Sequence, residues 1–322
     1  MGVTTYRRAG VDVKKGERLV EFLKSLSSTA VDGGIGGFAS ALELDLKSYR
    51  HPVLLSCTDG VGTKILVART LERYDTLGID LVAMSANDLA VCGASPMLFL
   101  DYIACGKIVQ PVLREVLRGI VRGCEMAGCR LAGGETAEMP DVYGPDDFDL
   151  AGFCVGVGEK DRLLPRTDAM TAGDLIFGLR SSGIHSNGLS LARKTLERRY
   201  WDDLLTPTLI YVQAFEQIRR SVEVLGAAHI TGGGLEGNLR RIVPGDLRPV
   251  LSYAWERPRV FELIQNRGRI EEAEMRATFN LGIGLALVVH PHQRHAIRAL
   301  AQGGDIDAAE IGTLEPRAAR GA

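Results

Sequence analysis

The chain has 322 residues, 46% of them hydrophobic, and a formal net charge of −2 at pH 7, which predicts an ordinary globular protein of about two domains. It has no basic block or arginine-rich arm, so we do not expect a nucleic-acid partner. The longest apolar runs reach about half the length of a membrane span, and the first residues lack the continuous apolar core of a secretory signal. We therefore expect no membrane partner and a cytoplasmic location.

Cysteine and glycine content gives further information about the class of protein. The six cysteines stand mostly inside apolar stretches, with no C-x-x-C pair and no histidine–cysteine cluster. We interpret them as small buried side chains in a reducing compartment rather than as a zinc site. Glycine supplies 38 of the 322 residues, above the usual level of about 7%, which indicates many tight turns or close backbone approaches.

Helical and strand-like patterns alternate along the chain. Apolar spacing predicts helices over residues 17–26, 80–93 and 111–128. Apolar runs predict strands over residues 52–58, 97–104, 148–158, 174–180, 227–231, 281–290 and 310–314. A charged, turn-rich stretch over residues 159–174 separates two halves. The pattern predicts an α+β fold of two domains, residues 1–163 and 164–322, each with helices on one side of a largely antiparallel sheet.

Four polar segments marked by glycine interrupt these elements: "DGGIGGFAS" (32–40), "TDGVGTK" (58–64), "GGETAEMPD" (133–141) and "SSGIHSNG" (181–188). Each alone is more typical of a loop than of a ligand site. Together they favour phosphate and metal chemistry, because glycine lets the backbone approach a ligand closely. Neither the Walker loop nor the dinucleotide fingerprint is present, since the lysine of Gly62-Thr63-Lys64 follows a threonine and "DGGIGGF" has the wrong spacing.

Acidic residues beside apolar runs are the candidate metal ligands. The helix predicted over residues 80–93 is apolar on nearly every side, yet it carries Asn87 and Asp88 in its middle. A buried carboxylate is costly unless it is paired, so we expect a bound cation or a lysine beside Asp88. Asp59 and Glu135 each stand at the end of an apolar run. Three carboxylates converging on one cleft would suit Mg²⁺ that also binds phosphate oxygens.

Lys64 and His185 are the candidate cationic and acid–base residues. Lys64 could neutralise phosphate charge, or it could be a solvated strand end. His185 lies between Ser181-Ser182-Gly183 and Asn187-Gly188, directly before a predicted helix whose free N–H groups form a natural anion site. We interpret His185 as catalytic or substrate-positioning, with a structural hydrogen bond as the alternative.

These segments together resemble the phosphoribosylformylglycinamidine cyclo-ligase family, also called aminoimidazole ribonucleotide synthetases, of purine biosynthesis. The matching stretches run from residue 6 to about residue 314: "YRRAGVDV", "GGIGGF", "TDGVGTK", "TLGIDLVAM", "NDL", "FLDYIA", "GGETAEMP", "DLAGFCVGV", "SSGIHSNG", "LLTPTLIYV", "AHITGGGL" and "TFNLGIG". The combination of "GGETAEMP" with "SSGIHSNG" is the specific part of this match.

The resemblance implies an ATP-dependent ring closure. In this family ATP phosphorylates the formyl amide oxygen of formylglycinamidine ribonucleotide, a neighbouring nitrogen attacks the activated carbon, and phosphate leaves. Phosphorylation makes closure feasible because an amide oxygen is a poor leaving group, and Mg²⁺ and cations stabilise the transferring phosphoryl group. The resemblance also implies a homodimer whose N-terminal domains close a shared barrel, with a C-terminal α+β domain flanking the active-site groove.

The resemblance also implies the site residues. Catalytic roles fall to Asp59, Lys64, Asp88 and His185, and metal binding falls to Asp59, Asp88 and Glu135. The nucleotide would contact Gly33, Gly34, Gly36, Gly37, Gly60, Gly62, Thr63, Gly134, Thr136 and Asn187. Residues 33–37 would form a mobile segment over the nucleotide, Lys64 would face phosphate charge, and His185 with Asn187 would face the substrate or phosphate.

A degenerate paralogue that binds nucleotide or assembles as a subunit without turnover is the alternative. Three departures from the family pattern favour it: Lys24 is the sole basic residue of "KSLSSTAVDGG", and Gly237 and Ala277 stand where the family usually has glutamate and arginine. Asp59, Asp88, Glu135 and His185 match the family pattern, which favours an active enzyme over a paralogue without turnover. Selenophosphate synthetase, thiamine-monophosphate kinase, a hydrogenase maturation protein and formylglycinamidine ribonucleotide synthetase share the expected fold but match these motifs less well.

Overall fold

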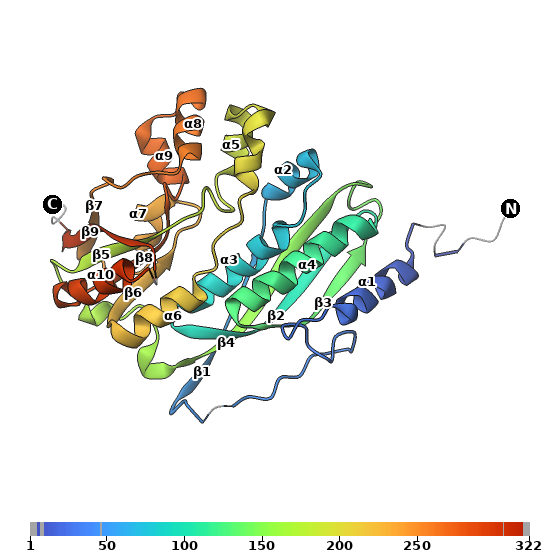
Figure 1. The fold of residues 1–322 in the computed structure, drawn as a ribbon, viewed down its shortest axis with the longest axis horizontal. Coiled ribbons are helices and arrows are strands. Elements are labelled where there is room, and N and C mark those ends of the chain that lie inside the picture. The colour runs from blue at the N-terminus through green and yellow to red at the C-terminus, as the bar shows by residue number, and fades with distance from the viewer. Residues whose placement is uncertain (1–4, 7–9, 46, 305, 318–322) are drawn as a thin grey trace.

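Two β-sheets, one in each half of the chain, organise the molecule (Figure 1). The computed structural model describes residues 5–6, 10–45, 47–304 and 306–317. Residues 7–9 of the first family motif lie outside the described residues. Helices pack against both sheets, so the fold is α+β in two parts, in agreement with the expected class.

The first sheet has four strands in the order β1-β4-β2-β3. They are β1 (Pro52–Gly60), β2 (Ala94–Cys105), β3 (Arg130–Glu138) and β4 (Phe148–Glu159). β4 pairs antiparallel with β1 and β2, whereas β3 pairs parallel with β2. The predicted loop character of "GGETAEMPD" is wrong for most of its length, because β3 runs through "GGETAE" as an edge strand. Its glycines fit there because Gly134 packs closely on Asp101 of β2.

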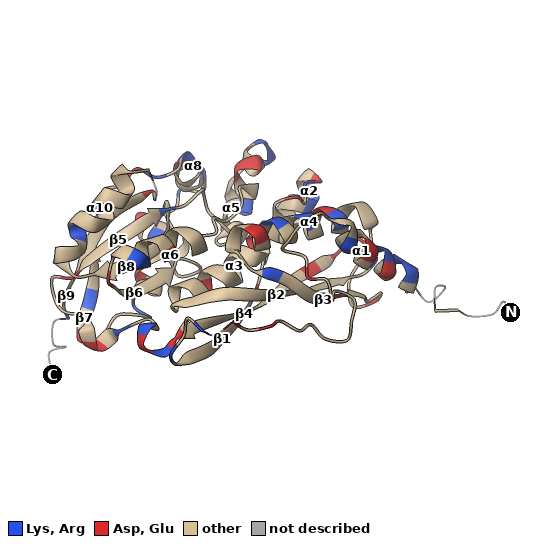
Figure 2. Cartoon of the chain, turned by 60° about the horizontal axis from the view of Figure 1, so that its bottom comes forward, with Lys and Arg blue, Asp and Glu red and all other residues tan. Residues whose placement is uncertain are grey.

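Four helices lie on the same side of this sheet, and none of the described helices lies on its other side (Figures 1 and 2). They are α1 (Val13–Ser25), α2 (Lys64–Leu71), α3 (Leu77–Val91) and α4 (Gln110–Ala127). α3 and α4 approach closely, since a Cβ on Gly78 would lie 2.2 Å from the Ile120 amide nitrogen. The predicted end of α4 is confirmed at Gly128, whose φ of 70° is left-handed. Leucine, isoleucine and valine side chains between helices and sheet form the core of this half.

The second sheet has five strands, all paired antiparallel, in the order β6-β8-β5-β9-β7. They are β5 (Leu175–Arg180), β6 (Val224–His229), β7 (Leu247–Leu251), β8 (Ile283–Val289) and β9 (Ala308–Pro316). Only β7 was not predicted, because Arg248 and Pro249 interrupt its apolar run; proline is tolerated there since β7 is an edge strand.

Short helices surround the second sheet. They are α5 (Leu189–Thr195), α6 (Val212–Ser221), α7 (Gly234–Leu239), α8 (Arg259–Gly268), α9 (Glu272–Thr278) and α10 (Arg294–Gln302), with 3₁₀ turns η1 (Lys160–Arg162), η2 (Thr167–Ala169), η3 (Arg198–Leu205) and η4 (Pro291–Gln293). α6 lies beside α3, so the two halves are packed together at this point (Figure 1).

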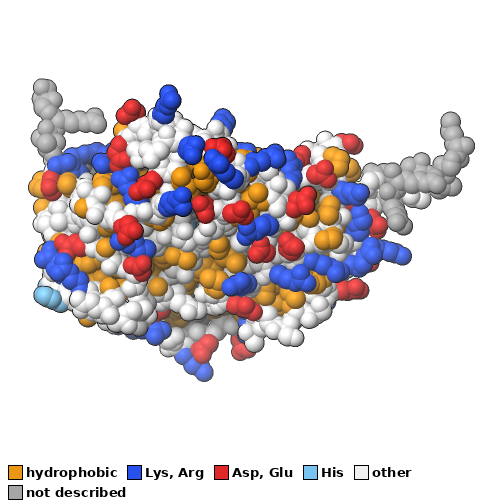
Figure 3. All heavy atoms as spheres, turned by 45° about the horizontal axis from the view of Figure 1, so that its top comes forward, with side chains coloured by type: hydrophobic (Ala, Val, Ile, Leu, Met, Phe, Trp, Pro, Cys, Tyr) orange, Lys and Arg blue, Asp and Glu red, His pale blue; other side chains and the backbone are white. Residues whose placement is uncertain are grey.

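Charged side chains of both signs are interspersed over the face shown in Figure 3. Within the described ranges, the search for a helix long and apolar enough to cross a bilayer finds none. All six cysteines are free; four are buried as predicted, but Cys57 is half-buried and Cys92 is exposed.

Candidate functional site

The four glycine-marked segments form two groups rather than one. In the first group, residues 34–40 and residues 133–136 line a cavity of about 600 Å³ beside α1. Gly36 has a φ of 94°, and a Cβ there would lie 3.0 Å from Val20 Cγ1, so a larger residue would strain this turn. Leu19, Val20 and Leu23 of α1 give the cavity an apolar wall. This arrangement suits the flat apolar part of a small ligand beside an exposed backbone.

A buried carboxyl group also lines this cavity. Asp101 of β2 is 7% exposed and pairs with Gly134 in the strand register. A Cβ on Gly134 would lie 2.3 Å from Asp101 Oδ1, so glycine is required for the carboxyl group to occupy this place. Burial raises the pKa of Asp101 to about 7. The sequence analysis missed Asp101, although it stands in the apolar strand "FLDYIA" as the one charged residue.

In the second group, "TDGVGTK" meets "SSGIHSNG" across the two halves of the chain. Asp59 is the penultimate residue of β1, and its Oδ1 accepts the Gly60 N–H at 2.7 Å. Gly62 has a φ of 64°, which allows the chain to turn into α2. Thr63 Oγ1 lies 3.2 Å from Ser190 Oγ, directly after the second segment.

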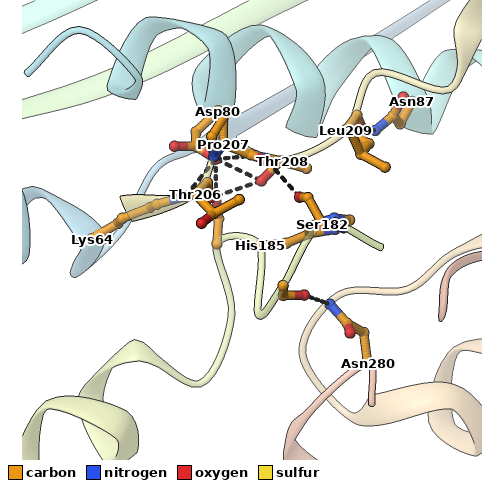
Figure 4. A network of polar contacts seen from close by, with 12 residues as sticks. Lys64, Asp80, Asn87, Ser182, His185, Thr206, Pro207, Thr208, Leu209 and Asn280 are labelled. Atoms are coloured by element: carbon orange, nitrogen blue, oxygen red, sulfur yellow. Dashed lines mark hydrogen bonds and ion pairs between the residues drawn. The ribbon is translucent and has the colours of Figure 1, made fainter. Parts of the chain in front are cut away.

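Lys64 does not face a ligand site, which corrects the expectation that it faces phosphate. Its side chain is fully buried, and Nζ donates to Asp80 Oδ1 at 2.8 Å and to the Thr206 carbonyl at 2.7 Å (Figure 4). Burial lowers the pKa of Lys64, and the Asp80 carboxylate opposes that shift. An ammonium group in an apolar interior requires such a partner, so Lys64 is part of the interior structure.

Asp80 is the buried carboxylate with a lysine partner that the sequence analysis placed at Asp88. Besides Lys64, Asp80 Oδ1 accepts the Thr208 N–H at 2.7 Å, the Thr208 hydroxyl at 2.6 Å and the Ser186 hydroxyl at 3.3 Å. These donors come from the second half of the chain, so Asp80 joins α3 to residues 206–208 (Figure 4). Asp80 could have been recognised from the sequence, because it is a charged residue in the first turn of the mostly apolar helix α3.

Asp88 lies in the last turn of α3, where it is partly exposed to solvent and contacts a histidine. Its side chain is 42% exposed, and Oδ1 lies 2.9 Å from His229 Nδ1. Burial, and after it the Gly60 N–H and the charge of Asp88, act on Asp59, with the net result that the pKa of Asp59 is raised. Two carboxylates and an imidazole therefore share this place. The sequence analysis did not assign His229, although it is the histidine of "AHITGGGL" at the end of a predicted strand.

His185 is buried, which corrects the expectation that it faces the substrate. It is 2% exposed, has a φ of 57°, and its Nε2 accepts the Ser182 N–H at 3.3 Å. Burial, followed by the charges of His229 and Lys64, holds the pKa of His185 well below its usual range. A Cβ on Gly284 would lie 2.6 Å from His185 Cε1, so the ring is packed tightly against β8. The structural alternative describes it better.

Asn187, in the same segment as His185, lies beside the turn that follows His229. A Cβ on Gly232 would lie 3.5 Å from Asn187 Oδ1, so the amide is next to the "TGGG" turn that follows His229. Asn187 Nδ2 is buried with no hydrogen-bond partner among the described residues. A buried donor without an acceptor is costly, so a ligand acceptor at this point would stabilise the site.

The expected convergence of three carboxylates is wrong within one chain. Asp59 lies in one row across the sheet with Gly152, Asp101 and Gly134, so Glu135 is on the opposite face by strand alternation. Three strand spacings separate β1 from β3, about 14 Å. Across the described ranges no group of three His, Cys, Asp or Glu residues could hold a metal ion. Asp59 and Asp88 are near enough for the Asp88 charge to contribute to the raised pKa of Asp59.

Two departures from the family pattern meet at one ring. The Tyr253 hydroxyl donates to Glu236 Oε1 at 3.4 Å, and the Arg276 guanidinium lies 3.9 Å above the same ring. Glu236 and Arg276 stand one place before Gly237 and Ala277. An acid and a base displaced in the same direction thus remain neighbours.

The sequence matches two family models. Residues 45–158 match the AIR synthase related protein, N-terminal domain, and residues 171–321 match the AIR synthase related protein, C-terminal domain. Among curated proteins, phosphoribosylformylglycinamidine cyclo-ligase of Anaeromyxobacter dehalogenans strain 2CP-1 is 46% identical, over 97% of this chain and 95% of its own length. The protein of that name from Nitrosospira multiformis is 47% identical, over 98% and 94%.

Solved structures share the fold at low identity. Thiamine-monophosphate kinase from Stenotrophomonas maltophilia K279a superposes with a TM-score of 0.67 at 19% identity, covering 93% of each chain. Hydrogenase maturation protein HypE in complex with ATP gives a TM-score of 0.67 at 18% identity, covering 96% of this chain and 88% of HypE.

Proposed function

The chain belongs to the AIR synthase family, and from this membership we propose that it closes the imidazole ring of aminoimidazole ribonucleotide in purine biosynthesis. The observation that carries the proposal is 46% identity to phosphoribosylformylglycinamidine cyclo-ligase over 97% of the chain. The enzyme is an ATP-dependent ligase that forms a C–N bond. A paralogue without turnover is not favoured, because the relatives match along nearly their whole length.

The reaction couples ring closure to ATP cleavage. The γ-phosphoryl group moves to the formyl amide oxygen, which becomes part of a phosphate leaving group. A substrate nitrogen then attacks the carbon that bears this oxygen, and phosphate leaves. The products are aminoimidazole ribonucleotide, ADP and phosphate. Asp88 is the residue we place closest to this chemistry, because its carboxylate is half-exposed and is held by His229.

Mg²⁺ is part of the proposal, and the residues present suit it. Mg²⁺ is commonly held by one or two carboxylates together with substrate phosphates and water. Asp59 and Asp88 supply two neighbouring carboxylates, and bound Mg²⁺ would neutralise phosphoryl charge. Glu135 enters the proposed ligand set only through a second copy of the chain, because it is exposed on the uncovered side of the sheet.

ATP contacts are proposed for both groups of glycine segments. The cavity beside Gly34, Gly36 and Gly37 would take the apolar part of the nucleotide. The remaining proposed contacts are Gly33, Gly60, Gly62, Thr63, Gly134, Thr136 and Asn187. Lys64 and His185 support the site from the interior, since both are buried.

A homodimer that closes a barrel is the proposed assembly. The uncovered face of the first sheet carries the exposed side chains of Leu54, Tyr102 and Phe153, and β1 and β3 are its edge strands, with β3 bridged to Val31 at Leu131. A second copy would cover these apolar groups and remove the edges. Phe153→Asp should lower the mass measured by light scattering from dimer to monomer; Val142→Asp, an exposed apolar position outside the strands, is the matched control. An unchanged mass for Phe153→Asp would contradict this interface.

We also propose the division of the chain into a nucleotide-binding and dimerisation domain over residues 1–163 and a groove-flanking domain over residues 164–322. The two sheets lie on either side of this point. A cytoplasmic location accompanies the proposal, because six free cysteines suit a reducing compartment.

The proposed function is tested by incubating the purified protein with Mg·ATP and formylglycinamidine ribonucleotide. ADP and aminoimidazole ribonucleotide should form in equal amounts. Asp88→Asn should form both products about 100-fold more slowly, whereas Asp161→Asn, at an exposed acid, should keep the wild-type rate. ATP binding by the wild type without either product would instead identify the paralogue.

A further inference from the structure

Asn87 is fully buried on α3, where the two halves of the chain meet. Its Oδ1 accepts the Tyr211 N–H at 2.8 Å, and its Nδ2 donates to the Leu209 carbonyl at 2.8 Å. A backbone N–H can only donate and a carbonyl can only accept, so these two bonds determine which end of the amide is oxygen. Figure 4 shows Asn87 directed from α3 toward Leu209.

The second N–H of Asn87 has a defined target. Nδ2 lies 3.4 Å from His229 Nε2, and Nδ2 is a donor only. Nε2 must therefore accept, which leaves the proton of the neutral ring on Nδ1. That nitrogen lies 2.9 Å from Asp88 Oδ1, so the ring donates its N–H to the carboxylate. The opposite tautomer would set two N–H groups against each other at Nε2 and a lone pair against a carboxylate at Nδ1.

We propose that Asn87 is a positioning residue that holds His229 in its Nδ1–H tautomer and so directs one N–H at Asp88 Oδ1. The consequence is that Asp88 is held from behind through one oxygen while its other oxygen stays available to a ligand. The imidazole cannot swing, because its side chain is 2% exposed and both nitrogens are engaged. Groups behind a functional carboxylate orient it in this way.

The first test needs no activity and no substitution. Nitrogen NMR of protein labelled with ¹⁵N-histidine, recorded at about pH 8 where imidazole is ordinarily neutral, distinguishes a ring protonated at Nδ1 from one protonated at Nε2. We expect the Nδ1–H pattern for His229, assigned by its loss in His229→Gln. An Nε2–H pattern in the wild type overturns the proposal.

The second test replaces the donor by an acceptor. Asn87→Asp keeps an oxygen for the Tyr211 N–H but puts a second oxygen opposite His229 Nε2, so a carboxylate then faces each ring nitrogen and Nε2 should become protonated as well as Nδ1. Asn280→Asp is the matched control, because Asn280 is also a buried amide that binds a backbone carbonyl, that of Gly183. The control should keep the Nδ1–H pattern. If Asn87→Asp also keeps it, Asn87 does not set the tautomer and the proposal fails.

A milder variant covers the case in which Asn87→Asp does not fold. Asn87→Ser removes Nδ2 without adding an acid, so the Nε2–H tautomer of His229 should become detectable beside the Nδ1–H tautomer that Asp88 still favours; a pure Nδ1–H pattern, as in the wild type, overturns the proposal. The activity consequence rests on the proposed function: kcat for ring closure should fall about 10- to 100-fold in Asn87→Asp. Absence of ring closure in the wild type would refute the proposed function and leave the tautomer result standing.

Discussion

Two carboxylates on α3, eight residues apart, have opposite surroundings. Asp80 is fully buried, and a lysine, a backbone N–H and two hydroxyl groups donate to its Oδ1. Asp88 is 42% exposed and receives one imidazole contact. A carboxylate that is sealed from solvent stabilises the fold and is closed to chemistry, whereas one held from behind keeps an oxygen for a ligand. Position on the same helix therefore does not imply the same role.

The largest effect is expected at Lys64, whose substitution tests whether Asp80 stabilises the fold. Lys64→Met leaves the Asp80 charge buried without its cation and should lower the free energy of unfolding by about 3–5 kcal/mol. Urea unfolding measures this loss. The double variant Lys64→Met with Asp80→Leu should recover much of it, because no unpaired charge remains. Unchanged stability together with weaker ATP binding would restore the phosphate-facing role of Lys64.

Asp101 sharpens the comparison, because it is a buried carboxyl group with no ion pair among the described residues. Its pKa is about 7 in the folded chain against 3.8 ordinarily, so the folded state holds a proton that the unfolded state releases. The free energy of unfolding should therefore fall as pH rises from about 4 to about 7. Asp101→Asn should remove this fall, which is up to about 4 kcal/mol.

The measurement for Asp101 is urea unfolding of wild type and Asp101→Asn at pH 5 and pH 8. The variant should gain on the wild type as pH rises. Asp146→Asn, an exposed acid, serves as control and should keep the wild-type pH dependence. A constant difference between Asp101→Asn and wild type would contradict the burial of an ionisable group.

The same substitution at the two α3 carboxylates should separate their roles. Asp88→Asn should lower kcat for ring closure by about 100-fold with a change in stability within about 1 kcal/mol. Asp80→Asn should instead lower stability, because Lys64 then lacks its counter-charge. Steady-state product formation and thermal unfolding, measured side by side, distinguish the two. A stability loss at Asp88 as large as that at Asp80 would remove the distinction.

The smallest expected effect concerns the coupling of Asp59 with Asp88. Burial raises the pKa of Asp59 and the Asp88 charge adds to it, so Asp88→Asn should lower that pKa while leaving it above the ordinary value. Carbon NMR titration of labelled aspartate follows Asp59 directly. If the pKa of Asp59 does not move, the two carboxylates are too far apart to hold one ion.

Periodicity predicted seven of the nine strands in the described part of the chain, because they lie in apolar runs, and it predicted α1, α3 and α4, but α2 and α6 to α10 were not predicted. It missed β3 and β7, because glycines in β3 and an arginine and a proline in β7 interrupt the apolar pattern of these two edge strands. Both the apolar context and the motif resemblance proposed Asp59 and Asp88 as site residues. The sequence could not show that Lys64 and His185 are buried, or that His229 and Asn87 lie behind Asp88, because these arrangements depend on contacts between different elements of the fold, such as His185 with Gly284 and Asn87 with His229.

Residues 206–211 are fastened to α3 at two points, by Asp80 at Thr208 and by Asn87 at Tyr211. The two anchors are seven residues apart, which is about two turns of helix. Neither anchor point exists until α3 has wound, and the partners lie 128 and 124 positions away along the chain. The second half can therefore dock only onto a first half that is already folded. The contact between Asp88 and His229 should consequently form late, and both halves should unfold in one cooperative step.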